Sequence, residues 1–152
     1  MIVLYNKLLK YCDSKKIDVY EIDLINKGLY SDGIIALSNR MSTSNEKACI
    51  LAEELGHYHT TVGDILDQSK AENRKQERRA RAWAYALLVP FEALIEAFEV
   101  GIIGRHDLAE FLGITEEYLQ QAINYYRDKY GVGIALGDYI IYFDPLGVMK
   151  II

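Results

Sequence analysis

Small side chains line one face of a predicted helix that Pro90 ends, and this face constrains the fold more than any other feature of the chain. Ala80, Ala84 and Leu88 recur every four residues, so they share a face of the helix with Glu77. Small alanines let a second helix approach closely, and a proline cannot continue helical hydrogen bonding. We therefore expect a tightly packed helix pair in which Glu77 faces the partner helix.

Capping and turn signals predict a small sheet ahead of this helix and further helices after it. Thr43 followed by Glu46 is a capping box, which starts a helix before an apolar run. The Asp32-Gly33 pair predicts the turn of a hairpin. The predicted elements are a helix over about 1–15, strands over 19–24, 28–30 and 34–37, helices over 43–55, 72–89 and 91–99 with a loop at 62–69, helical runs on both sides of Gly113, and a hairpin over 134–143.

This pattern predicts an α+β fold in one domain over residues 1–152. A small sheet of about three strands and a helical bundle form a core over 1–98, and a helical pair with a C-terminal hairpin forms an extension over 99–152. The 152 residues are 51% hydrophobic and 26% charged, which is the balance of a globular domain rather than of a disordered tail.

Composition excludes several other classes of protein. No run of about eighteen apolar residues is present, and no cleavage site follows the first apolar residues, so we expect a cytoplasmic protein without a membrane partner. Cys12 and Cys49 lack a metal-binding spacing and are expected to be core thiols. Residues 91–152 have 4 Lys and Arg against 10 Asp and Glu, whereas residues 1–90 have 13 against 12, so we expect no nucleic acid binding by the C-terminal part.

Residues 53–57 carry the chemistry of a predicted metal site. They read E-E-L-G-H, which differs from the zinc protease pattern H-E-x-x-H only in having Glu53 where the first histidine belongs. Each helical residue turns about 100°, so Glu53 and His57 lie about 40° apart on one face of the helix, with Glu54 at its flank. This spacing lets Glu53 and His57 reach the same metal ion.

A third ligand comes from the helix that ends at Pro90. Catalytic zinc takes three protein ligands and leaves one position for water. Glu77 follows His57 by twenty residues and faces the motif helix, so Glu53, His57 and Glu77 are the predicted metal ligands. The alternative is that the glutamates form a solvated helix face and His57 is a surface histidine, because acidic pairs on helices are common.

Together these segments resemble the ImmA/IrrE-type metallopeptidases of bacteria, phages and integrative elements. Residues 77–90 read E-R-R-A-R-A-W-A-Y-A-L-L-V-P, which is similar to the family's E-x-x-A-x-x-[FW]-A-x-x-L-L-x-P signature. The resemblance implies a zincin-like metallopeptidase of the gluzincin type, with zinc as cofactor, His57 and Glu77 as ligands and Glu54 as the general base. It also implies a protein substrate, a transcriptional repressor that is cut to release lysogeny or transfer genes.

Glu53 departs from that family, in which a histidine holds the metal at this place. Two carboxylates and a neutral histidine reduce Zn²⁺ to a formal charge of zero, whereas one carboxylate and two histidines leave +1. Water at such a centre should be less acidic than at a three-histidine site, where its pKa is about 7. We therefore expect slow catalysis and weaker selection against manganese or another hard divalent cation.

Several further signals leave their roles open. His59 lies about 200° around the helix from His57, so it is expected to pack or hydrogen-bond at the helix end unless the helix unwinds before it. Tyr58 and His106 are candidate donors to an oxyanion, although an exposed position near a helix cap is favoured for His106. The basic run 74–81 either grips an acidic substrate segment or nucleic acid, or is simply an exposed helix face.

Residues 107–119 have the cadence of a helix-turn-helix, with Gly113 at the turn. Glu116 and Glu117 open its second helix, where their charge would face phosphate, so a structural or partner-docking role is favoured over DNA reading. Two alternatives to an endopeptidase therefore stay open. One is a degenerate peptidase fold that inactivates a repressor by contact, and the other is a DNA-binding regulator acting through residues 107–129.

Overall fold

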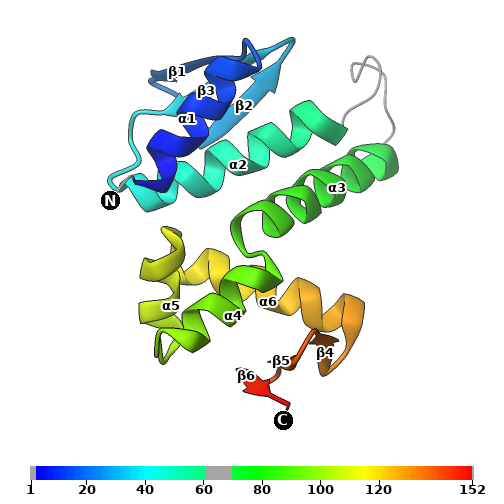
Figure 1. Cartoon of the computed structure of the whole chain (residues 1–152). Coiled ribbons are helices and arrows are strands. Elements are labelled where there is room, and N and C mark those ends of the chain that lie inside the picture. Colours follow the sequence, from blue (N-terminus) through cyan, green and yellow to red (C-terminus); the bar gives the residue numbers. More distant parts are fainter. Residues whose placement is uncertain (1–2, 61–69, 152) are drawn as a thin grey trace. The chain divides into compact units, whose positions relative to one another are not determined.

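The computed structural model describes residues 3–60 and 70–151, which contain six helices and six strands (Figure 1). The chain divides into two units, Met1–Leu88 and Val89–Ile152. The first unit contains α1 (Leu4–Ser14), β1 (Asp18–Ile22), β2 (Gly28–Ser31), β3 (Ile34–Ser38), α2 (Ser44–Thr60) and α3 (Lys70–Leu88). The second contains α4 (Phe91–Glu99), α5 (Arg105–Leu112), α6 (Glu116–Tyr130), β4 (Gly133–Leu136), β5 (Tyr139–Phe143) and β6 (Leu146–Lys150). The α+β class is confirmed, the predicted loop at 62–69 lies outside the described residues, and the single domain stays a prediction.

The sheet of the first unit has the strand order β1-β3-β2. β1 runs parallel to β3, and β2 runs antiparallel to β3 through the predicted turn, where Asp32 and Gly33 have φ values of 45° and 77°. β3 is the central strand, and its Ile35 and Leu37 are fully buried. β2 is consequently an edge strand, and its Gly28 lies directly against α2.

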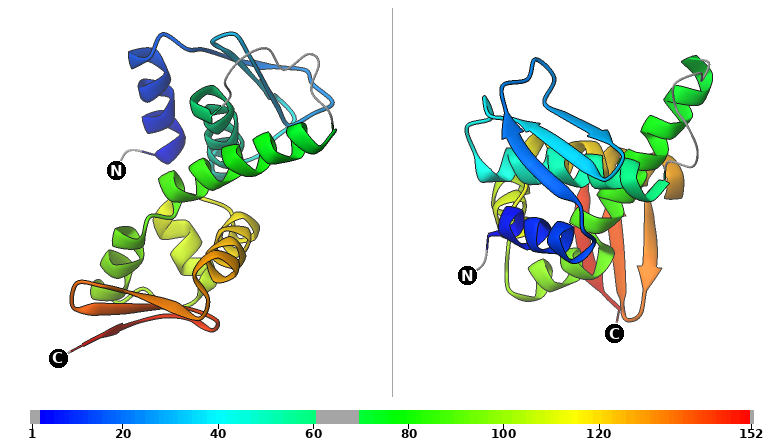
Figure 2. Two further views of the ribbon diagram at one scale, coloured as in Figure 1. Left: turned by 90° about the vertical axis from the view of Figure 1, so that its right-hand side faces the viewer. Right: turned by 90° about the horizontal axis from the view of Figure 1, so that it is seen from above.

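α2 lies between this sheet and α3 (Figure 1; Figure 2). Its start matches the predicted cap, because Thr43 Oγ1 accepts a hydrogen bond from the backbone N–H of Glu46 at 3.1 Å. The Glu46 carboxylate pairs with Lys27 Nζ at 3.6 Å. At its other end the helix continues to Thr60, beyond the predicted end near residue 55.

Gly56 explains why α2 does not stop where the sequence suggested. It lies inside the helix at the crossing with α3, where a Cβ atom would lie 2.2 Å from the carbonyl oxygen of Ala80. Only glycine fits that space, so its role is close packing rather than helix termination. Ala80 and Ala84 are fully buried, which confirms the predicted alanine face. The crossing places the residue after Gly56 near the residues that precede Ala80.

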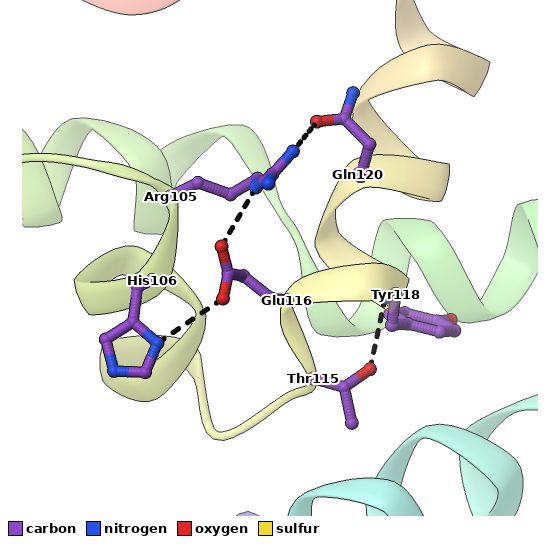
Figure 3. Close-up of polar contacts among 6 residues, drawn as sticks. All are labelled: Arg105, His106, Thr115, Glu116, Tyr118 and Gln120. Carbon is purple, nitrogen blue, oxygen red and sulfur yellow. Dashed lines mark hydrogen bonds and ion pairs between the residues drawn. The ribbon is translucent and has the colours of Figure 1, made fainter.

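The second unit contains the predicted helical pair and a three-stranded antiparallel sheet, β4-β5-β6. The predicted hairpin forms β4 and β5, and β6 adds a third strand. Thr115 caps α6 by accepting a hydrogen bond from Tyr118 N–H at 3.1 Å (Figure 3). Arg105 Nε and His106 Nδ1 lie 3.1 and 3.4 Å from the two carboxylate oxygens of Glu116, so Glu116 joins α5 to α6 (Figure 3).

The structure also bears on two predictions made from composition, which concern the cysteines and membrane-spanning helices. Cys12 and Cys49 are buried core thiols, as expected. Burial raises the pKa of Cys12 to about 11. Within the described part of the chain, no helix has the length and apolar character needed to cross a membrane.

Candidate functional site

A pocket of about 350 Å³ in the first unit brings β2, α2 and α3 together. Its wall combines a strand edge with the facing sides of two helices. The lining residues are Gly28, Leu29 and Tyr30 of β2, Glu54 and His57 of α2, and Asn73, Gln76 and Glu77 of α3. Three of the four predicted site residues therefore line one pocket.

His57 and Glu77 are in direct contact across this pocket. His57 Nε2 lies 3.2 Å from Glu77 Oε1, and the side chains are 17% and 52% exposed. The close helix crossing accounts for this contact, because His57 follows Gly56 and Glu77 lies three residues before Ala80, the residue that Gly56 meets. The prediction that these two residues converge from neighbouring helices agrees with this geometry.

Glu54 lines the same pocket, and its carboxyl group lies against β2. A Cβ atom on Gly28 would lie 3.0 Å from Glu54 Oε1, so the strand passes close to this carboxyl. Burial, together with the negative charges of Glu53 and Glu77, raises the pKa of Glu54 to about 7. A carboxyl group that titrates near neutral pH is well suited to accept and release a proton, as a general base must.

Glu53 is the predicted site residue that the pocket does not include. Burial raises the pKa of Glu53, and Arg81 opposes this rise. Across residues 3–60 and 70–151, no three His, Cys, Asp or Glu side chains are placed to hold a metal ion. The structure thus brings His57 and Glu77 together, while Glu53 as a third ligand stays a prediction.

His57 and Glu77 suit a divalent cation both in their ligand atoms and in the charge around them. An imidazole nitrogen and a carboxylate oxygen are both ordinary zinc ligands. Glu53 and Glu77 both oppose the ionisation of Glu54, which means that negative charge is concentrated at the site. A cation would relieve this repulsion, so His57 and Glu77 are the two residues in position to hold it.

The other two histidines have structural roles. α2 stays helical through His59, whose ring stacks on Trp83 with 4.5 Å between centroids and whose Nε2 is hydrogen-bonded to the Tyr11 hydroxyl at 2.7 Å. The packing role expected for His59 is confirmed, and the unwound ligand is not. His106 lies on α5 of the second unit, 72% exposed and beside Glu116, which agrees with its expected exposed position.

Sequence reasoning missed three polar residues of the pocket. Tyr30 lines it, whereas Tyr58, the phenol named from the sequence, contacts Tyr30 edge-on with 6.1 Å between ring centroids. Asn73 and Gln76 precede Glu77 by four residues and by one, and Gln76 is only 8% exposed. The four-residue spacing is a signal that could have found Asn73, because it places Asn73 on the face of Glu77.

The two crossed helices bring a histidine and glutamates to one pocket beside a sheet edge. The fold is of the metallopeptidase type. The family model of the IrrE N-terminal-like domain, Peptidase_M78, matches residues 9–124. The chain belongs to this family, which is generally zinc-dependent, and the resemblance drawn from the two motifs is confirmed. No curated protein and no solved structure matches the chain significantly.

Glu54 should make the stability of the metal-free protein depend on pH. Its pKa in the folded protein is about 7, against an ordinary value of 4.5, so the folded state binds this proton more tightly than the unfolded state. The resulting stabilisation is complete below pH 4.5 and is lost as the pH rises through 7. In urea titrations with EDTA, we expect the loss of unfolding free energy between pH 5 and pH 8 to be about 2 kcal/mol smaller in Glu54→Gln than in the parent. Equal losses would contradict the assignment.

Proposed function

We propose that the protein is a metal-dependent endopeptidase that cleaves a transcriptional repressor of a phage or mobile element. The observation that carries the proposal is the contact between His57 and Glu77 beside the half-buried carboxyl of Glu54, in a chain of the Peptidase_M78 family. The repressor as substrate is supported by the resemblance to the ImmA/IrrE-type enzymes.

Glu54 is the residue that moves protons in the proposed reaction. A divalent cation held by His57 and Glu77, with Glu53 as the predicted third ligand, would supply Lewis-acid polarisation of a water molecule and of the peptide carbonyl. In its ionised form Glu54 accepts a proton from the attacking water and then passes it to the leaving amine. His57 and Glu77 stay fixed by the crossing of α2 and α3 during these steps.

Tyr30 is the phenol that we assign to the developing oxyanion, because it lines the pocket with Glu54 and His57. Tyr30→Phe is expected to lower kcat about 10²-fold with little change in KM, since the donor acts mainly in the transition state. Tyr58→Phe is the matched control, because Tyr58 packs against Tyr30 without lining the pocket. Steady-state kinetics on the cleaved repressor measure both variants, and equal losses would show that Tyr30 has only a packing role.

The proposed activity is tested by incubating the purified protein and zinc with the repressor encoded nearest its own gene. We expect discrete fragments whose ends are defined by mass spectrometry, no cleavage in EDTA, and recovery of cleavage when zinc or manganese is restored.

A second candidate function is a binding module that inactivates the repressor by contact. It is favoured by the position of Glu53, which is not among the residues that line the pocket. That candidate is correct if the added protein releases the repressor from its operator DNA while the repressor itself stays uncut.

A further inference from the structure

α3 presents a row of three arginines on a face next to the one that lines the pocket. Arg74, Arg78 and Arg81 are exposed, and their spacing of four and three residues places them within about 60° of one another around the helix. Asn73 and Glu77, which line the pocket, lie on the adjoining face of the same helix. The arginine row therefore spans about 10 Å of α3, beside the helix face that lines the pocket.

The positive charge of this row is locally concentrated. Residues 73–81 contain five Lys and Arg and one Glu, in a chain whose net charge is −5. None of the three arginines forms an ion pair with another residue in the described part of the chain. The charge of Arg81 also reaches the site, because it opposes the rise in the pKa of Glu53. The row is thus available to an anionic partner that enters the pocket.

We propose that Arg74, Arg78 and Arg81 bind an acidic segment of the protein substrate next to the bond that is cut. The inference rests on the proposed peptidase function and names the substrate feature that the site would recognise. Two arginines four residues apart on a helix are separated by about 6 Å along its axis. Side chains at alternate positions of an extended peptide are about 6.6 Å apart, so acidic residues at positions i and i+2 match the row. Guanidinium groups pair with carboxylates in a planar, two-point geometry.

A nucleic acid fits this surface less well than an acidic peptide. Glu54 and Glu77 line the adjoining pocket, where their carboxylates would repel a continuous phosphate backbone. Three cations also release few counterions, which gives weak duplex binding at physiological salt. An acidic peptide avoids the repulsion, because its uncharged residues can occupy the pocket while its carboxylates lie on the row.

Binding is tested without cleavage, in the Glu54→Gln protein. The probe is a fluorescein-labelled peptide containing Asp-Ala-Asp-Ala-Asp, and fluorescence anisotropy gives its Kd at low and high salt. An exposed ion pair changes a binding constant by up to about fivefold, so Arg74→Gln combined with Arg78→Gln should weaken binding about tenfold. The matched control combines Lys75→Gln with Arg79→Gln, which removes the same charge from a face about 100° further around the helix. Glutamine keeps helix propensity, and we expect the control to stay within about twofold.

Three results would overturn the arginine row as a binding site. They are equal losses in the two double variants, tighter binding of a labelled DNA duplex than of the acidic peptide, and no binding of the acidic peptide by the parent at low salt. The test is separate from the proposed activity. A protein that never cleaves its repressor but shows the expected difference between the double variants would contradict the peptidase and still support the row.

Discussion

Glu54→Gln is expected to lower the rate of repressor cleavage by about 10³-fold while the fold and the metal content stay unchanged. Glutamine has nearly the shape of glutamate, so it fits the space that Gly28 leaves for this side chain. It cannot accept the proton of the attacking water, and the proposed reaction then lacks its base. Single-turnover cleavage, circular dichroism and metal analysis together separate this loss from unfolding.

The matched control for this variant is Glu117→Gln, which removes the same charge from an exposed residue of the second unit. It should cleave at the parent rate. The peptidase proposal is contradicted if Glu54→Gln relieves repression as well as the parent does, because relief would then need no proton transfer. Such a result would favour the contact mechanism.

Gly56→Ala is expected to reduce the free energy of unfolding by about 3 kcal/mol. The added Cβ would lie 2.2 Å from the carbonyl oxygen of Ala80, a backbone atom that moves only if the helices separate. Alanine is a better helix former than glycine by about 1 kcal/mol, so propensity alone predicts the opposite sign. Separation of α2 and α3 would also pull His57 away from Glu77 and weaken metal binding.

Urea titration of Gly56→Ala and Gly147→Ala measures this effect. Gly147 is the control, because a Cβ atom there meets nothing within 4 Å. We expect its unfolding free energy to stay within about 1 kcal/mol of the parent value. A Gly56→Ala protein that is as stable as the parent would show that the helix crossing tolerates a side chain.

The helix pair could be predicted from sequence because its signals are periodic. Ala80 and Ala84 at four-residue spacing define a buried face, and the half-exposed Glu77 lies at its flank. His57 and Glu77 are consequently brought together as predicted. The cap at Thr43 could also be predicted, because a threonine followed three residues later by a glutamate is a local signal for a helix start.

Other features depend on contacts that no local pattern records. Gly56 was expected near a helix end, and only the Ala80 backbone facing it explains why the helix continues. Tyr30 reaches the pocket because β2 is the edge strand next to α2, which is a property of strand order. Glu53 shares a helix face with His57 by spacing, but the residues around the pocket decide whether it reaches the site.

Zinc titration of the metal-free protein tests most directly whether the first unit holds a cation at His57 and Glu77. Isothermal titration calorimetry of the parent, Glu54→Gln, His57→Ala and Glu77→Ala gives the stoichiometry and the affinity of each. We predict close to one zinc ion per chain for the parent and Glu54→Gln, and affinities more than about 100-fold weaker for His57→Ala and Glu77→Ala, since even outer-shell losses cost up to that much. Unchanged zinc affinity in His57→Ala and Glu77→Ala would contradict the metal site.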